Sequence, residues 1–221
     1  MIISLASCSQ KTGFEKAYDN ISIDEMKRHV SILASDDFMG RAPFTRGEEL
    51  TVEYLKNELE KMGFEPAFGG SYYQPVPMVE IRSEVKNTVD IQTEAGSHKL
   101  DAPDDIALIS PRIEDKISID KSELVFAGFG IKAEEYDWND FSDLDVKGKT
   151  IVVFVNDPGL YTGDSDFFKG SEMTYYGRWT YKYEQAARMG AEGILIIHET
   201  KGAGYPYNIP RKSSISPNLY L

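Results

Sequence analysis

The stretch 179–198 constrains the fold of this chain more than any other. Apolar residues recur at helical spacing in its first half, Gly190 stands where a left-handed residue closes a helix, and residues 194–197 are a continuous apolar run. Upstream, residues 150–155 form another short apolar run after a turn signal. Apolar strands joined through a helix are typical of a parallel sheet with a helical crossover, so the sequence predicts one module over about 122–199.

The composition limits the classes of partner. The chain has 221 residues, 41% hydrophobic and 27% charged, which suits one or two globular domains. Acidic residues outnumber basic ones by 36 to 24, giving a formal net charge of −12. Because such a surface repels phosphate backbones and anionic lipid, we expect no nucleic-acid partner. The sequence also lacks an apolar run of about 18 residues, so no membrane-spanning helix is predicted.

The single cysteine, Cys8, follows a short apolar segment ending in Leu5-Ala6-Ser7. One cysteine excludes an internal disulfide and a multi-cysteine zinc site. The segment resembles the bacterial lipobox, in which the chain is cut before the cysteine and the new N-terminus is acylated, although the charged start and most of the apolar core of a signal peptide are missing. We expect residues 1–20 to be a signal remnant and tether, with Cys8 as the lipidation site. The alternative is an accidental match at a frayed terminus.

Two helices are predicted next, each with end signals in the sequence. For a helix over 22–35, Ser22 and Glu25 are expected to form a capping box; for a helix over 46–62, Thr45 and Glu48 are expected to form another. The first apolar face consists of Ile23, Met26, Val30 and Leu33, and the second of Leu50, Tyr54, Leu55, Leu59 and Met62.

Residues 72–81 are strand-like, and Pro75 and Pro77 restrict them to an edge or a bulged position. Between residues 82 and 121 the pattern is less regular and favours antiparallel strands and loops.

The string L-A-S-D-D-F-M-G-R-A-P-x-T-x-G-E-x-x-x-x-E-Y-L, followed by K-M-G-F-E-P and S-Y-Y-Q-P-V-P, resembles the start of bacterial zinc aminopeptidases of the group that contains glutamate carboxypeptidase and the transferrin receptor. The resemblance covers nearly the whole chain after residue 20. It implies that residues 21–81 are the N-terminal part of a peptidase domain, and that residues 82–221 are an inserted protease-associated (PA) domain.

Later strings extend this resemblance to the PA domain. They are V-F-A-G-F-G-I, Y-D-W-N-D-F, L-D-V-K-G-K, T-I-V-V-F-V-N-D-P-G and, most specifically, M-T-Y-Y-G-R-W-T-Y-K-Y-E-Q-A-A-R-M-G-A-E-G-I-L-I-I-H-E-T. The expected fold is α/β (α+β): a helical part of a zinc-exopeptidase domain, then a β-rich PA domain whose one main helix lies near 179–189.

The remaining motifs give weaker functional signals. Gly128-x-Gly130 lacks the third glycine and the helix of a dinucleotide loop. The acidic residues of 134–145 lack the spacing of a calcium loop, so a solvated loop is favoured, and calcium or substrate contact at the aspartates of 157–166 is the minority interpretation. The pair Asp36 and Asp37 is typical of turns and caps. We interpret the three histidines, His29, His98 and His198, as structural or solvent-facing residues rather than metal ligands.

The predicted catalytic and metal-ligand sets are therefore empty for this chain. The family's His-x-Asp strand end, bridging aspartate, adjacent glutamate pair and later histidine have no match here, and we expect them, with two zinc ions, downstream of residue 221.

Two functions remain open. The first is the N-terminal and PA part of a secreted or lipid-anchored zinc aminopeptidase of the bacterial cell envelope, either periplasmic or an outer-membrane lipoprotein. It would act on a peptide or protein substrate and touch the membrane only through the lipid. The second is a non-catalytic module of the envelope that binds proteins or peptides.

Overall fold

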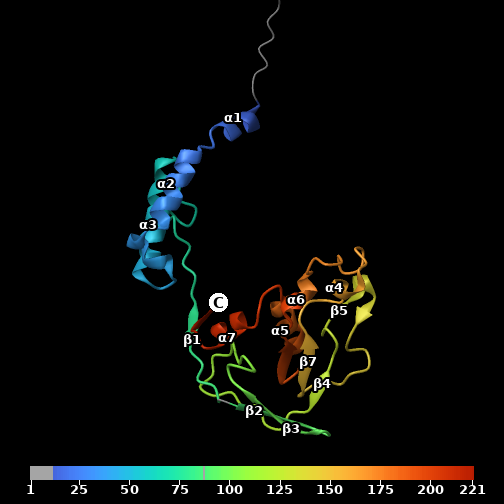
Figure 1. The fold of residues 1–221 in the computed structure, drawn as a ribbon. Helices are drawn as coiled ribbons and strands as arrows, with labels where there is room; N and C mark the ends of the chain where they lie inside the picture. The colour runs from blue at the N-terminus through green and yellow to red at the C-terminus, as the bar shows by residue number, and fades with distance from the viewer. Residues whose placement is uncertain (1–11, 87) are drawn as a thin grey trace, which may run out of the picture. The chain divides into compact units, whose positions relative to one another are not determined.

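The computed structural model describes residues 12–86 and 88–221; Cys8 and most of the predicted tether lie outside them. The chain divides into two compact units, Met1–Val76 and Pro77–Leu221, hereafter unit 1 and unit 2 (Figure 1). Helices and strands both occur, as predicted for a mixed α/β chain. Among the described residues, none of the helices has the length and apolarity needed to cross a bilayer.

Unit 1 is helical. It contains α1 (Gly13–Asp19), α2 (Ile23–Leu33), the 3-10 segment η1 (Asp36–Arg41) and α3 (Arg46–Lys61), so both predicted helices are present. Ser22 caps α2 by accepting a hydrogen bond from the Glu25 amide at 3.3 Å, but the Glu25 carboxylate pairs with Arg28, so only half of the predicted capping box forms. The capping box predicted at Thr45 is wrong. The Thr45 hydroxyl donates to the Ala42 carbonyl at 2.6 Å, and Glu48 accepts from the Phe44 amide instead.

Polar side chains join α2 to α3. Arg28 Nη2 lies 2.7 Å from Glu58 Oε2, and His29 Nδ1 lies 2.6 Å from the Tyr54 hydroxyl. The neighbouring cations of Lys61 and Arg28 lower the pKa of Glu58 to about 2. His29 is thus a structural residue of this contact.

The apolar faces of unit 1 are largely exposed. In α2, Ile23 is 69% exposed, Met26 58% and Val30 65%. In α3 and at its end, Leu55 is 46% exposed and Met62 62%. Unit 1 therefore contains two amphipathic helices whose apolar sides it does not bury by itself.

Unit 2 is built on a parallel sheet of β4 (Leu124–Phe126), β7 (Thr150–Phe154) and β8 (Gly193–Ile197), in the order β4-β7-β8. The crossover from β7 to β8 contains α5 (Trp179–Arg188). The predicted parallel pairing is confirmed: Ile151 is opposite Ile194, and Val153 is opposite Ile196. The chain turns after α5 at Gly190, whose φ of 72° is left-handed, as the sequence indicated.

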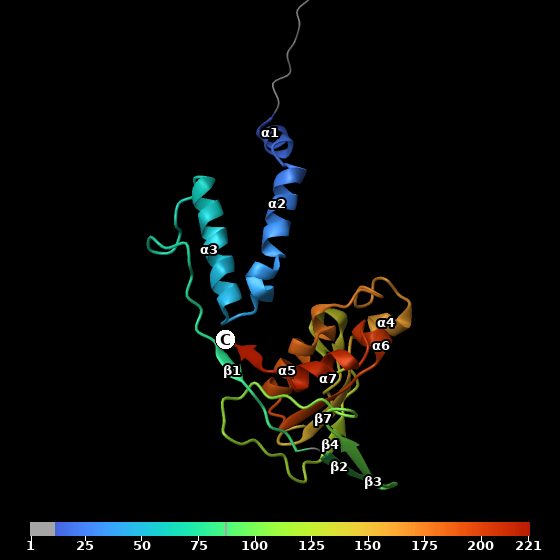
Figure 2. The same ribbon diagram turned by 60° about the vertical axis from the view of Figure 1, so that its left-hand side comes forward.

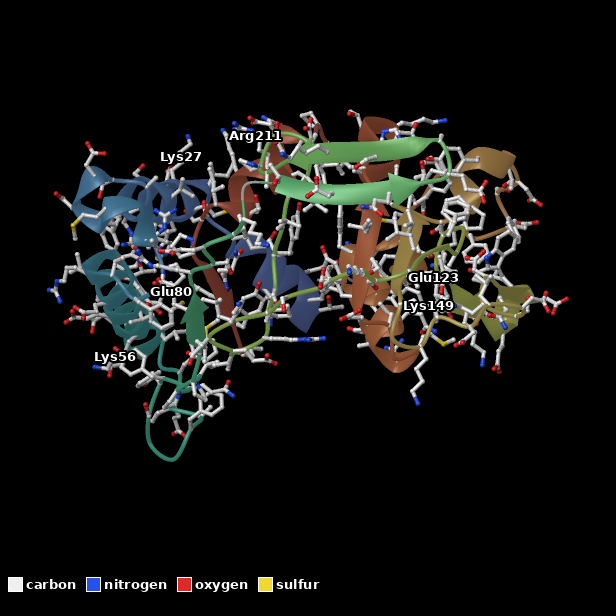
Figure 3. All side chains as sticks on the ribbon, turned by 90° about the horizontal axis from the view of Figure 1, so that it is seen from below. Lys27, Lys56, Glu80, Glu123, Lys149 and Arg211 are labelled. Carbon is white, nitrogen blue, oxygen red and sulfur yellow. The ribbon has the colours of Figure 1, made fainter. Side chains whose placement is uncertain are left out.

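The main core lies where α5 packs on this sheet, and its buried members are Ala127, Phe141, Val146, Ile151, Val153 and Ala186. A second, aromatic cluster contains buried Phe168 and Tyr181 with Tyr136, Trp138, Phe167 and Tyr176 around them. At its centre the rings of Tyr136 and Phe168 stack with centroids 4.1 Å apart. At the amino ends of β4 and β7, an ion pair of 3.1 Å joins Glu123 to Lys149 (Figure 3).

The rest of unit 2 consists of short elements. The hairpin β2 (Thr88–Thr93) and β3 (Gly96–Asp101) precedes the sheet, and a small antiparallel pair joins β5 (Lys132–Ala133) to β6 (Trp138–Asn139). Short helices follow the sheet strands: α4 (Gly159–Thr162), α6 (Thr200–Ala203) and α7 (Asn208–Ser214). The 3-10 turns are η2 (Glu134–Tyr136) and η3 (Tyr175–Gly177).

Unit 2 is closed by its own ends. Strand β1 (Val79–Ile81) pairs antiparallel with β9 (Asn218–Tyr220), with Glu80 opposite Leu219 (Figure 2). The strand predicted over 72–81 is thus too long, because prolines at 75 and 77 cannot donate ladder hydrogen bonds. The pairing also places β1 in unit 2, whereas the sequence assigned it to the N-terminal part.

Candidate functional site

The carboxyl end of the parallel sheet gathers most of the unusual chemistry of unit 2. Loops leave β4, β7 and β8 at this edge, where the ligands of open α/β sheets commonly bind. Helices α4 and α6, which follow β7 and β8, lie side by side there in both views (Figures 1 and 2). The loops are tightly turned: φ is 50° at Gly128, 65° at Gly130 and 71° at Asn156. A left-handed asparagine directly after a strand indicates that its surroundings hold it there.

Two adjacent polar side chains fix the loop after β7. Asp157 is fully buried and accepts from the Thr174 amide at 2.9 Å, the Thr174 hydroxyl at 2.7 Å and the Gly159 amide at 3.2 Å. Asn156 donates from Nδ2 to the Gly202 carbonyl at 2.8 Å, which links the ends of β7 and β8. The Asn156 Oδ1 accepts from the Asp157 amide at 2.8 Å, and both Asp157 oxygens accept within the protein, so this pair supports the edge of the sheet.

Lys182 of α5 lies beneath the same edge and is only 1% exposed. Its Nζ donates to the Phe129 carbonyl and, at 2.8 Å, to the Asn156 carbonyl, so one amine holds together the loops after β4 and β7. Burial lowers the pKa of Lys182 to about 7, and the charges of Asp140 and Asp157 oppose this shift only in part. The sequence analysis missed this residue. Its position four residues before buried Ala186, on the same helix face, was the available signal.

A row of aromatic rings crosses the outer side of this edge, and we call Phe126, Phe129, Phe154 and Tyr161 the aromatic row. Successive centroids lie 5.5, 5.8 and 5.9 Å apart, from Phe126 through Phe154 and Phe129 to Tyr161. The Lys201 ammonium lies 5.4 Å from the Tyr161 ring centroid. Phe126 is 56% exposed and Tyr161 46%, so the row is open to a partner.

Tyr161, a member of the aromatic row, also makes a polar contact: its hydroxyl donates to Glu199. Partial burial, and then the neighbouring Glu199 carboxylate, raise the pKa of Tyr161 to about 12. The phenol therefore stays neutral at physiological pH and can act as a hydrogen-bond donor, but it is no nucleophile.

The remaining sequence candidates do not join this site. His198 stacks with Trp179 at 6.2 Å between centroids and contacts the rings of Tyr205 and Tyr207. His98 sits in β3 opposite Ile91 and is exposed. Asp36 and Asp37 begin the exposed turn η1, and the Asp166 amide donates to Asp164 at 2.9 Å within a loop. In the acidic loop, Glu135 accepts from the Tyr176 hydroxyl and Asp140 from the Ile131 amide.

Histidine, cysteine and acidic side chains do not gather in groups of three or more anywhere in the described ranges 12–86 and 88–221.

Comparison with known proteins adds no relative: no protein-family model, no curated protein and no solved structure matches this chain.

Proposed function

We propose that this chain is the N-terminal and PA-domain part of a secreted or lipid-anchored zinc aminopeptidase. In this proposal unit 1 belongs to the peptidase domain, unit 2 is the PA domain inserted into it, and residues downstream of 221 bind the zinc ions. The bound metal would polarise a peptide carbonyl and activate a water. The residues described in unit 2 supply no part of that chemistry, but offer a surface for a peptide.

The observation that carries the proposal is the pairing of β1 with β9. The chain enters and leaves unit 2 through two neighbouring antiparallel strands, with Val79 opposite Tyr220 and Ile81 opposite Asn218. A domain whose two ends lie together can be inserted into a loop of another domain without disturbing it.

The exposed apolar faces of α2 and α3 support the same proposal. Ile23, Met26 and Val30 form a stripe at helical spacing with more than half of each side chain exposed. Stripes of this kind ordinarily pack against a sheet or another helix. We infer that the rest of a peptidase domain covers them.

The test is the reading frame beyond residue 221. We expect it to encode a His-x-Asp strand end, a bridging aspartate, an adjacent glutamate pair and a later histidine, and its full product to release dye from aminoacyl-nitroanilides in a chelator-sensitive manner. Residues 1–221 alone should neither release dye nor bind zinc stoichiometrically in calorimetry. A longer reading frame that lacks those metal ligands would refute the proposal that the protein is a zinc aminopeptidase.

A non-catalytic binding module is the second candidate, and the aromatic row favours it. Exposed aromatic side chains are the residues most enriched at the centres of protein interfaces. If the downstream ligands are missing, capture of a peptide or protein by the row becomes the function to test, with Phe126→Ser as the inactivating variant.

Localisation to the cell envelope is proposed from Cys8. Because one acyl chain binds membranes only marginally, stable anchoring needs the two or three chains of a bacterial lipoprotein. Cys8→Ser should move the protein from the membrane fraction to the soluble fraction of its native host. Unchanged partitioning would contradict acylation.

A further inference from the structure

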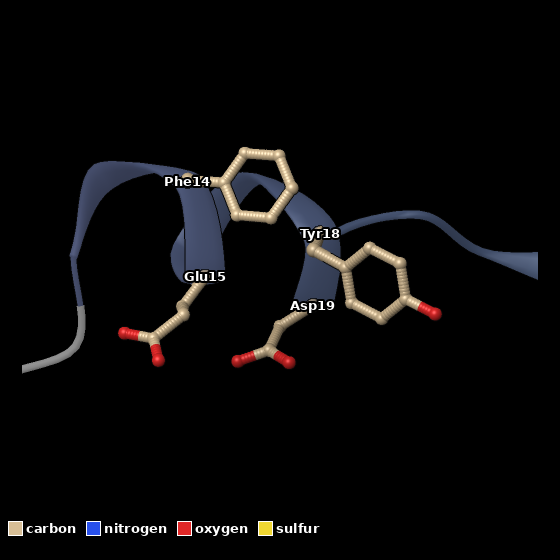
Figure 4. A pocket seen from close by; sticks show the side chains of 4 residues that line it. All are labelled: Phe14, Glu15, Tyr18 and Asp19. Atoms are coloured by element: carbon tan, nitrogen blue, oxygen red, sulfur yellow. The ribbon is translucent and has the colours of Figure 1, made fainter.

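Helix α1 presents two aromatic side chains to solvent on one side. Phe14 is 79% exposed and Tyr18, one turn later, 67% exposed. Figure 4 shows both rings beside each other, while Glu15 and Asp19 point away from them on a neighbouring side of the helix. We call Phe14 and Tyr18 the α1 aromatic face. The sequence analysis assigned most of this segment to a polar tether, so neither the helix nor its aromatic face was expected.

We propose that the α1 aromatic face docks on an uncharged, zwitterionic lipid surface and acts as a second membrane contact beside the acylated cysteine. This inference rests on the lipid anchor proposed above. Phe14 lies only six positions after Cys8, and an extended chain spans at most about 3.6 Å per residue, so an acyl chain at Cys8 holds α1 within roughly 20 Å of the bilayer. The helix is then confined to the layer where the bilayer interface lies.

The chemistry of the face fits that layer. Aromatic rings concentrate at membrane interfaces, tyrosine in particular, because its ring is apolar and its hydroxyl is wet. The acyl chains of a lipoprotein already hold the protein at the bilayer, so a second apolar contact on the same chain adds to their binding multiplicatively.

Charge selects the kind of lipid. Between Cys8 and Asn20 the charges of Lys11 and Lys16 balance those of Glu15 and Asp19, while the whole chain has a formal net charge of −12. The segment has no excess of basic residues to attract anionic headgroups, which the whole chain repels, so zwitterionic headgroups are the surface that the aromatic face can approach.

The test separates this contact from the acyl chain. The full chain carrying Cys8→Ser, and so unacylated, is sedimented with phosphatidylcholine vesicles, alone and with Phe14→Gln and Tyr18→Gln added. Glutamine keeps the helix propensity high. The matched control carries Phe64→Gln and Tyr73→Gln, which replace a phenylalanine 59% exposed and a tyrosine 41% exposed elsewhere in unit 1.

We expect the α1 pair to lower the partition coefficient about tenfold and the control pair to leave it within about twofold, with phosphatidylglycerol in the vesicles weakening binding at low salt. Equal losses in both pairs, no loss in the α1 pair, or binding that requires anionic lipid would each overturn the proposal. Fractionation of Cys8→Ser in the native host reports on acylation separately, so failure of the anchor and failure of the aromatic face give different results.

Discussion

Replacing Lys182 by methionine tests the arrangement of unit 2 most directly. Methionine is unbranched and of similar length, so it fills the same space while removing the amine that donates to the Phe129 and Asn156 carbonyls. The change also removes a titrating group that is 1% exposed. Its effect on stability should therefore depend on pH in a way that no surface lysine can reproduce.

The sign follows from proton linkage. Folding lowers the pKa of Lys182 from 10.5 to about 7, so between these values the unfolded chain holds a proton that the folded chain has lost. Stability then rises with pH across this window and is flat below about pH 7. The full shift corresponds to roughly 5 kcal/mol at 1.36 kcal/mol per pKa unit, and about 3 kcal/mol of it falls between pH 7 and 9.5. Tyrosines such as Tyr183, whose pKa burial raises to about 12, act in the opposite direction only above pH 10.

Urea denaturation of the full chain, followed by tryptophan fluorescence, measures this effect. Both tryptophans, Trp138 and Trp179, lie in unit 2, so the signal reports that unit alone. The wild type should gain stability from pH 7 to 9.5, Lys182→Met should lose most of that gain, and Lys201→Met, in an exposed position, should keep it. If Lys182→Met retains the wild-type pH dependence, burial does not lower the pKa of Lys182 in the folded chain.

Three further substitutions have effects on stability that follow from the structure. Asp157→Ala should destabilise unit 2 by about 3 kcal/mol, because the Thr174 and Gly159 amides lose a buried acceptor. The control Asp164→Ala, in an exposed loop, should cost under about 0.5 kcal/mol. Urea titration followed by tryptophan fluorescence compares the two variants. Gly159→Ala should cost about 2 kcal/mol or more by the same measurement, because its Cβ would lie 2.7 Å from the Phe167 carbonyl oxygen. Glu58→Gln should flatten the acid dependence of unit 1: the native pKa of Glu58 is about 2, so its contribution is present above pH 4.5 and is lost as pH falls toward 2, which hydrogen exchange of α3 amides detects.

Local sequence patterns correctly predicted those helices and strands that are specified by residues close together in the chain. The apolar runs of β7 and β8 and the helix between them needed no distant information, and the left-handed Gly190 marked where that helix ends. Of the strand predicted over 72–81, only Val79–Ile81 forms, after the two prolines that lack a donor for ladder hydrogen bonds. The Thr45 capping box did not form because the Thr45 hydroxyl donates to the Ala42 carbonyl, and Glu48 accepts from the Phe44 amide instead of the Thr45 amide.

The residues of the candidate site come from positions far apart in the sequence, so local patterns could not predict their contacts. Lys182 meets Phe129 and Asn156 across 53 and 26 positions, and only the parallel order β4-β7-β8 brings those loops above α5. A lysine on a helix is normally solvated, so composition and spacing favoured an exposed side chain. The aromatic row was missed for a similar reason: its members come from β4, the loop after β4, β7 and α4.

The two units differ in what they need in order to be stable, and this bears on the choice between enzyme and binding module. Unit 2 has two buried clusters and is closed by β1 and β9, so it contains the apolar core that an independent domain requires. Unit 1 joins its helices through Arg28, Glu58, His29 and Tyr54, contacts that contribute little net free energy, and leaves the stripe of α2 uncovered. Hydrophobic burial is the dominant favourable term in folding, so a segment of this kind is stable only when a further surface covers it. Under the proposal, a peptidase domain that resumes after its inserted domain would cover this stripe. A binding module consisting of unit 2 alone would leave it exposed, so the exposed side of α2 argues against unit 2 acting alone. A non-catalytic module that keeps the peptidase fold fits the stripe as well as the enzyme does.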